Sequence, residues 1–404
     1  MNSALSKLTI ANYKSIYRPQ SIDFSKTNKK TVAMYGKNAS GKSNIIRALQ
    51  TIVDIIIHSG DADYELPYHP FHYASNPTTV IPTVFSIEVT NSQHTMEYSF
   101  AYNGTSITRE TLKLKSENTN KYKTLFLRAG NEMINSSAAN YGFGQKLLER
   151  TLPKTLLLTK AYEDNNPFAK FIFDAIRHIK FAPMNSVGLE MRVTKILAEN
   201  ADIRRRVSDQ MVKYDPGIIG VTTYPTHAPN NLLGSDTTEV GLLQKLMRLN
   251  ITNVDIARKY NNVVFSEDIS NESAGTRTIL TTLTILLNAI KHDDMLCMDE
   301  FGNYIHPYIV AEISKFYESQ NPNKIFFVST HQLGLYDYID RTERIIVRKD
   351  PELGETIIDQ RKASSNNRKL RKDKQEADNN FINNTVLEKM TIEESKLYDE
   401  LGLL

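Results

Sequence analysis

The sequence predicts an α/β protein with a mixed sheet core, an antiparallel β subdomain and an inserted helical subdomain. Residues 31–35 form an apolar run that ends in glycine, and helical periodicity follows from Ser43, as in a buried strand, loop and helix. Short alternating segments between about residues 80 and 128 favour antiparallel strands. Helix and strand patterns alternate again from residue 276, which is typical of a sheet covered by helices.

The first elements follow from short-range alternation. Leu8 and Ile10 indicate one strand, and Ile22 and Phe24 indicate a second. Asn103-Gly104 separates two alternating runs, and this dipeptide is typical of a hairpin turn. We therefore expect the N-terminal third to be rich in strands.

The later elements are expected to change from helical to alternating. Residues 145–260 favour helices, with irregular breaks. Further along we expect a helix at 276–292, strands at 295–298 and 325–329, a helix at 307–320 between them, and a hairpin formed by 345–347 and 356–358. No solenoid repeat and no sustained heptad pattern is present, which excludes repeat arrays and long coiled coils.

The composition is that of a globular protein. The chain has 404 residues, of which 40% are apolar and 24% are charged, and these values exclude collagen-like and globally disordered classes. The single cysteine, Cys297, cannot form an internal disulfide and is expected to be a buried thiol. The N-terminus lacks a signal-type apolar segment, and no apolar run is long enough to span a membrane, so we expect a cytoplasmic protein.

The net charge of +3 is unevenly distributed. Residues 361–375 contain one acid, Asp373, and many basic residues. The basic residues are Arg361, Lys362, Arg368, Lys369, Arg371, Lys372 and Lys374. The rest of the chain is therefore net acidic, which gives no support to non-specific DNA binding by the body. The favoured interpretation of this basic tail is a solvated segment, and contact with nucleic acid or a partner is the alternative. The triplet Arg204–Arg206 has the same two interpretations.

A glycine-rich loop gives the strongest functional signal. The loop matches the GxxxxGK[ST] pattern, in which glycines turn backbone amides toward phosphate oxygens and the lysine adds positive charge. The following helix offers its positive N-terminal end to the same anion. The expected phosphate-binding residues are Gly36, Lys37, Asn38, Ala39, Ser40, Gly41, Lys42, Ser43 and Asn44, and the Ser43 hydroxyl is also expected to bind Mg²⁺.

Two acids and a histidine follow later strands. Asp299 and Glu300 end the strand at 295–298, where Asp299 would hold Mg²⁺ and Glu300 would act as general base. A strand that merely ends in surface acids is the alternative. His331 follows the strand at 325–329, at the edge where open α/β sheets bind ligands. It could reach the γ-phosphate or order the attacking water, whereas a lone histidine there is more often structural.

The segment Ser273-Ala274-Gly275-Thr276 precedes the helix at 276–292. Ser273 could simply cap this helix. It could also meet a nucleotide phosphate together with the Gly275 amide and the helix dipole. The segment lies far from the phosphate loop in the chain, so that phosphate would belong to a second subunit. Both interpretations can hold together.

In chain order the motifs are the phosphate loop, the Ser273 segment, the two acids and His331. This order resembles that of the ABC-type ATPases of the SMC/RecF-like branch. The opening motif of that branch is similar to Ile10–Ile16. The chain also resembles the AAA-family ATPases of phage-resistance loci, the RloA and AbiL-like group. The residues that carry this second resemblance are Pro70-Phe71, Glu272–Arg277, Asp299–Phe301, His306-Pro307 and Thr330–Gln332. Ser-Ala-Gly replaces the usual Ser-Gly-Gly, and Phe301–Tyr304 departs from the usual pattern after the acids.

The resemblance implies an ABC-type ATPase head that uses ATP and Mg²⁺. Ser273 and Gly275 would contact the γ-phosphate held by the opposite protomer of a homodimer or higher homo-oligomer, and Lys14 would be an extra phosphate contact. The expected segments are the N-terminal part of the core at 1–60, the antiparallel β subdomain at 61–140, a helical insertion at 141–262, the C-terminal part of the core at 263–360, and the basic tail with a C-terminal helix at 361–404.

Three functions are compatible with these residues. The first is a sensor and scaffold that controls a separate effector, a nuclease or toxin, in anti-phage defence; few residues follow His331, so we expect no nuclease domain in the chain. The second is a RecF-like DNA-binding ATPase in repair or replication restart. The third is a small-substrate kinase or GTPase, which the Ser273 segment, His331 and the lack of an Asn-Lys-x-Asp motif disfavour.

Overall fold

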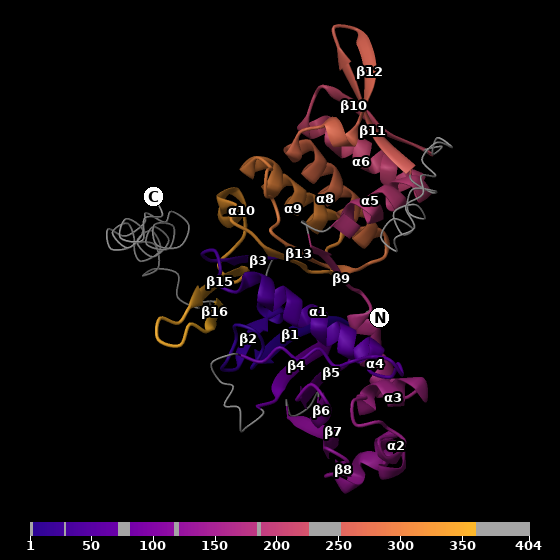
Figure 1. The fold of residues 1–404 in the computed structure, drawn as a ribbon, viewed down its shortest axis with the longest axis vertical. Helices are drawn as coiled ribbons and strands as arrows, with labels where there is room; N and C mark the ends of the chain where they lie inside the picture. Colours follow the sequence, from indigo (N-terminus) through magenta and orange to yellow (C-terminus); the bar gives the residue numbers. More distant parts are fainter. Residues whose placement is uncertain are drawn as a thin grey trace, which may run out of the picture.

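The computed structural model describes residues 3–27, 30–71, 81–116, 121–183, 187–225 and 252–360. A six-stranded sheet crosses the middle of the molecule (Figure 1). A second sheet and short helices lie on one side of it, and a bundle of helices lies on the other. The predicted tail at 361–404 lies outside the described residues.

The antiparallel sheet has seven strands in the order β2-β1-β4-β5-β6-β7-β8. These are β1 (Ala4–Ala11), β2 (Gln20–Asp23), β4 (Thr83–Thr90), β5 (Thr95–Tyr102), β6 (Ile107–Lys115), β7 (Tyr122–Ala129) and β8 (Glu132–Met133). Phe24, expected in a strand, instead begins the 3₁₀ helix η1 (Phe24–Lys26). The predicted turn at Asn103-Gly104 is confirmed between β5 and β6, and Gly104 has a φ of 89° that favours glycine.

The central sheet is mixed, in the order β16-β15-β3-β14-β13-β9. Its strands are β3 (Thr31–Tyr35), β9 (Ile179–Pro183), β13 (Met295–Asp299), β14 (Phe326–Ser329), β15 (Arg344–Lys349) and β16 (Thr356–Gln360). All neighbours pair in parallel except β15 and β16, which form the predicted hairpin. Cys297 lies in β13 as a fully buried thiol, as predicted, and its burial raises its pKa.

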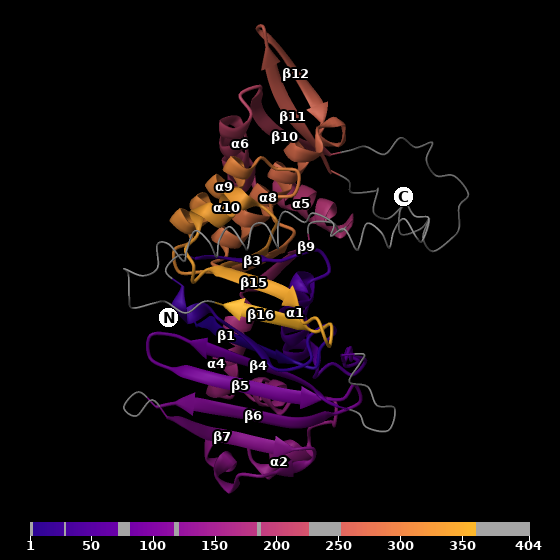
Figure 2. The same ribbon diagram turned by 90° about the vertical axis from the view of Figure 1, so that its left-hand side faces the viewer.

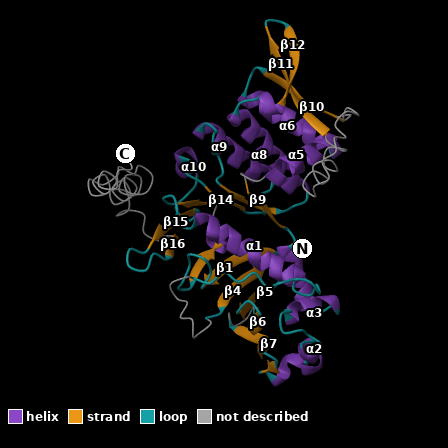
Figure 3. Ribbon diagram, in the orientation of Figure 1, coloured by secondary structure: helices purple, strands orange, loops and turns teal. Residues whose placement is uncertain are grey.

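Two hydrophobic cores lie on the two faces of this sheet. Val32 and Met34 of β3 point into the first core, which contains the helix α1 (Lys42–His58) and the antiparallel sheet. Ala33 and Tyr35 point into the second core. That core contains α5 (Val187–Glu199), α6 (Ala201–Tyr214), α8 (Ala274–Lys291), α9 (Pro307–Gln320) and α10 (Leu333–Tyr338). Figure 3 shows α1 on one side of the sheet and α8 and α9 on the other.

The segment expected to be helical contains strands as well. Its short helices α2 (Gln145–Glu149), α3 (Leu157–Glu163) and α4 (Pro167–Ile176) pack in the first core, after the 3₁₀ helix η3 (Ser136–Tyr141). β9 then joins the central sheet. A three-stranded antiparallel sheet, β10 (Ile218–Pro225), β11 (Thr252–Tyr260) and β12 (Val263–Asp268), projects from the helical end of the molecule (Figure 2). Neither β9 nor this sheet was predicted.

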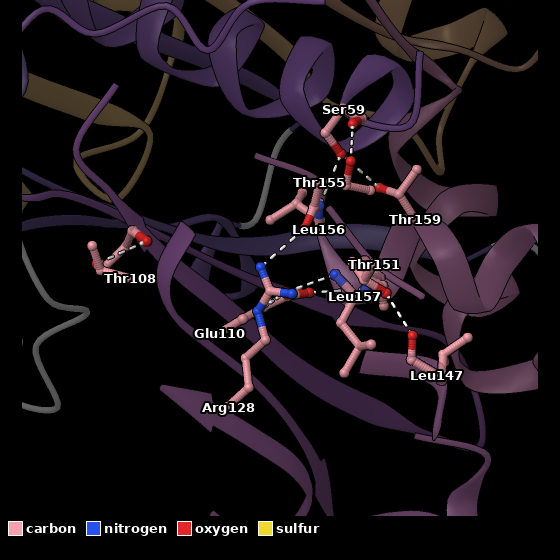
Figure 4. Close-up of polar contacts among 12 residues, drawn as sticks. Ser59, Thr108, Glu110, Arg128, Leu147, Thr151, Thr155, Leu156, Leu157 and Thr159 are labelled. Carbon is pink, nitrogen blue, oxygen red and sulfur yellow. Dashed lines mark hydrogen bonds and ion pairs between the residues drawn. The ribbon is translucent and has the colours of Figure 1, made fainter. Parts of the chain in front are cut away.

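A buried polar cluster joins the end of α1 to the antiparallel sheet (Figure 4). Thr155 donates a hydrogen bond of 2.7 Å to the carbonyl of Ser59, and its own carbonyl accepts from Arg128 at 2.9 Å. Arg128 pairs with Glu110 at 3.2 Å, and Glu110 accepts the amide of Leu157 at the start of α3. The cluster satisfies polar groups at two helix ends that a dry core would otherwise leave unpaired.

The predicted fold class is confirmed: a mixed sheet core, an antiparallel β subdomain and a mainly helical insertion. Within the described part of the chain, no helix has the length and apolar character needed to cross a membrane.

Candidate nucleotide site

The phosphate loop links β3 to α1, and steric crowding explains its glycines. A Cβ on Gly36 would lie 2.1 Å from the carbonyl oxygen of Val347. A Cβ on Gly41 would lie 2.1 Å from the Thr356 hydroxyl, and Gly41 also has a φ of 108°. Larger residues are therefore excluded at both positions, and the turn leads into the positive N-terminal end of α1, which favours anions.

Lys42 lies inside the loop. Its residue is 8% exposed, and its Nζ donates to the carbonyls of Gly36 at 2.7 Å and Lys37 at 3.0 Å. Burial lowers the pKa of Lys42, and the negative charges of Asp299 and Glu300 oppose this effect. The parallel neighbours β3, β14 and β13 end on the same side of the sheet, which brings the lysine and both acids into one neighbourhood, although they are about 260 residues apart in the chain.

The two acids extend from the end of β13. The Ser329 hydroxyl, at the end of β14, donates to the Asp299 carboxylate and accepts the amide of Glu300 at 2.8 Å. Glu300 has a φ of 55°, which a non-glycine residue rarely adopts. Asn303 donates to the Glu300 carboxylate at 3.2 Å. The two neighbouring carboxylates are therefore held by different donors, Asp299 by Ser329 and Glu300 by Asn303.

His331 follows β14, which lies between β3 and β13 in the sheet. Desolvation and the positive charge of Lys42 lower the pKa of His331, and Glu300 opposes this effect. This shift favours the neutral imidazole, which keeps one N–H that can donate to phosphate or water. The preceding Thr330 is fully buried and donates to the carbonyl of Phe301 at 2.7 Å. This hydrogen bond holds the backbone next to the histidine in place.

The predicted metal ligands are hard oxygen donors. Ser43 lies in the first turn of α1, next to Lys42 in the chain. The negative charge of Asp299 acts on Lys42 and favours its protonated form. The described residues contain no group of three or more histidines, cysteines or acids able to enclose a metal. One hydroxyl and one carboxylate suit Mg²⁺, which usually keeps water ligands and takes phosphate oxygens from its substrate. The buried Ser40 hydroxyl, which has no hydrogen-bond partner among the described residues, is a further polar group for a nucleotide.

Sequence reasoning missed Ser15 and Thr356. The Thr356 hydroxyl, at the start of β16, donates to the carbonyl of Ser40 at 2.8 Å and lies 2.8 Å from the Ser15 hydroxyl. The Ser15 hydroxyl also accepts from Asn44 at 2.8 Å. These contacts support the phosphate loop from outside. Ser15 belongs to the opening motif and could have been found there, but no local pattern marks Thr356.

The structure shows other contacts for Lys14. Its Nζ is 5.8 Å from the centre of the Tyr13 ring, and burial and the charge of Arg47 lower its pKa. Its backbone has a φ of 49° and donates to the carbonyl of His69 at 2.7 Å. The described contacts of Lys14 do not include the phosphate loop, and its role as a phosphate contact stays a prediction.

The segment Ser273–Thr276 begins α8. The Ser273 hydroxyl accepts the amide of Thr276 at 3.1 Å, which confirms the capping interpretation. Ser273 and Ala274 are exposed, and a Cβ on Gly275 would lie 2.9 Å from the carbonyl oxygen of Tyr304. Since α8 packs in the second core and α1 in the first, the segment and the phosphate loop of one chain begin helices on opposite faces of the sheet.

One protein family has a sequence model that covers these motifs. A sequence model of one protein family matches residues 32–337, and no curated protein matches the chain. An SMC head domain from Thermotoga maritima shares 14% identity and a TM-score of 0.45, over 89% of this chain and 100% of that one. An Smc head domain bound to the C-terminal domain of ScpA, derived from Pyrococcus furiosus, shares 13% identity and a TM-score of 0.43, over 93% and 99% of the two chains.

The family model confirms the predicted resemblance to the AAA family, whereas the narrower resemblance to the RloA and AbiL-like group stays a prediction. The matched residues include the phosphate loop, the Ser273–Thr276 segment, both acids and His331. The chain belongs to the family described as "AAA domain, putative AbiEii toxin, Type IV TA system".

Proposed function

We propose that this chain binds ATP with Mg²⁺ and hydrolyses it, and that two copies close around two ATP molecules. The phosphate loop would hold the β- and γ-phosphates through its amides and Lys42. Ser43 and Asp299 would hold Mg²⁺, which when bound neutralises phosphate charge. Support comes from the parallel pairing of β3, β14 and β13, whose ends carry the phosphate loop, His331 and both acids, and from the effect of the charges of Asp299 and Glu300 on Lys42.

Glu300 would take the proton of the attacking water. Its carboxylate is held by Asn303, and its backbone is held by the Ser329 hydroxyl, so its position is fixed before nucleotide binds. Neutral His331 would donate a hydrogen bond to the γ-phosphate or to that water. The lowered pKa of His331 supports this role, because a protonated histidine beside Lys42 would be repelled.

The opposite placement of α1 and α8 is the observation that carries the dimer. A single chain presents its phosphate loop from the first core and its exposed Ser273 from the second core. Two copies related by a two-fold axis can each place Ser273 and Gly275 against the other's nucleotide. The positive N-terminal end of α8 suits a γ-phosphate in that position.

We propose further that ATP-dependent closure makes the chain a sensor and scaffold for a separate effector, a nuclease or toxin, in anti-phage defence. The family description names a toxin and a toxin–antitoxin system, which supports this setting. Cells that carry the chain with its neighbouring genes should plate phage poorly, and Lys42→Ala should restore plating. Equal plating with both versions would contradict the defence role.

ATP-dependent association tests the dimer. Glu300→Gln is expected to bind ATP without hydrolysing it, so with Mg²⁺-ATP it should sediment as a dimer, whereas with ADP it should remain a monomer. Lys42→Ala in the same background is the control, because it removes a phosphate contact and should prevent association. A mass that does not change with ATP would contradict the proposal.

A further inference from the structure

The three-stranded sheet is connected directly to the segment that begins α8. It projects from the helical end of the molecule in both views (Figures 1 and 2). β12 ends at Asp268, the short 3₁₀ helix η5 (Ile269–Asn271) follows, and Glu272 then precedes Ser273. The sheet and the proposed γ-phosphate contact are therefore separated by only a few residues of chain.

Arg258 of the middle strand, β11, ties this connection back to the sheet. Its Nε donates to one oxygen of the Glu272 carboxylate and its Nη2 to the other, both at 2.8 Å. Its Nη1 donates to Asp215, after α6, at 2.9 Å. The side chains of Arg258 and Glu272 are 11% and 6% exposed. A two-bond pair of this kind fixes the plane of the carboxylate as well as its distance.

The neighbouring residues transmit this orientation to Ser273. Ser273 follows Glu272 and caps α8 through the amide of Thr276. Gly275 lies against the carbonyl of Tyr304, in the loop that follows Glu300. The segment is thus held from the three-stranded sheet on one side and from the catalytic loop on the other, while the Ser273 residue itself is exposed.

We propose that Arg258 is a positioning residue that orients the Ser273–Thr276 segment for the nucleotide of a second copy, so that the three-stranded sheet controls closure of the dimer. This inference rests on the proposed function. A purely structural role would change folding stability and leave closure at saturating ATP unchanged. Positioning instead requires a loss of closure while the phosphate loop, in the other core, binds ATP normally.

The test uses the full chain in the Glu300→Gln background. Arg258→Met should weaken ATP-dependent dimerisation about tenfold at saturating Mg²⁺-ATP. Arg258→Lys should have a smaller effect, because lysine keeps the charge and loses the two-bond geometry. Asp215→Asn is the matched control, since it alters the same guanidinium's other contact and leaves the pair with Glu272 intact. The ATP affinity of each monomer should stay within about twofold of the parent.

A second variant guards against misfolding. Arg258→Met with Glu272→Met removes both buried charges together, so neither is left unpaired, and it should fold yet still dimerise weakly. If both Arg258→Met and this double variant dimerise like the parent, the inference is overturned. If the parent fails to dimerise with ATP, the proposed function is overturned, and the inference with it.

Discussion

Two buried arginine–glutamate pairs lie on opposite sides of the central sheet, and their surroundings differ. Arg128 and Glu110 have side chains that are 2% and 0% exposed, and they lie between the antiparallel sheet and α3. Arg258 and Glu272 are slightly more exposed and lie beside the exposed Ser273. The first pair holds together parts that are wholly internal, whereas the second holds a segment that faces outward.

This difference agrees with a stabilising role for the pair of Arg128 and Glu110 and with the proposed positioning role for the pair of Arg258 and Glu272. Glu110 accepts the amides of Leu157 and Leu158 and the hydroxyl of Tyr98, so all of its partners are buried. Ser59, Thr155 and Arg128 of that cluster are buried as well. The pair around Arg258 has fewer partners but is connected to a residue that a second copy could contact. We therefore expect changes at the two pairs to be measured by different assays.

The largest effect is expected at Glu300, which follows β13 of the central sheet. Glu300→Gln should lower the rate of ATP hydrolysis by about 10²- to 10⁴-fold, because the amide cannot accept the proton of the attacking water. ATP affinity should stay close to that of the wild type. Steady-state phosphate release measures the rate, and Glu312→Gln on α9 is the control. Wild-type hydrolysis by Glu300→Gln would remove the catalytic assignment.

The next largest effect is expected at the internal pair. Arg128→Met should lower the free energy of unfolding by about 3–5 kcal/mol, because Glu110 remains charged and buried without its partner. Urea unfolding followed by circular dichroism measures this loss. The control is Arg150→Met, which breaks an ion pair with Asp164 whose side chains are 64% and 48% exposed and should cost about 1 kcal/mol or less. Similar losses in both variants would contradict the comparison.

Much of the fold could be predicted because its signals are local. The apolar run at 31–35, the turn at Asn103-Gly104 and the hairpin of β15 and β16 each depend on residues close together in the chain. β9 was missed because five residues after a helix carry too little periodicity to mark a strand, and its partner β13 lies more than a hundred residues later.

The same distinction holds for the candidate site. Lys42, Asp299, Glu300 and His331 stand in recognisable motifs, and the structure brings them together. The hydrogen bond between Ser15 and Thr356 joins residues 341 positions apart, so it depends on how the segment after β1 packs against the start of β16. No sequence motif marks Arg258 either, because its proposed role depends on a contact with Glu272 that forms only when β11 and the segment after η5 fold together.

Mixing two inactive variants tests the shared site most directly. Lys42→Ala keeps its Ser273 segment, and Ser273→Arg keeps its phosphate loop, so each variant alone should lack hydrolysis. An equal mixture should recover hydrolysis, up to the quarter of the wild-type rate that random pairing would give, because each mixed dimer has one intact composite site. A mixture that remains as inactive as either variant would contradict the claim that the two copies share their ATP sites.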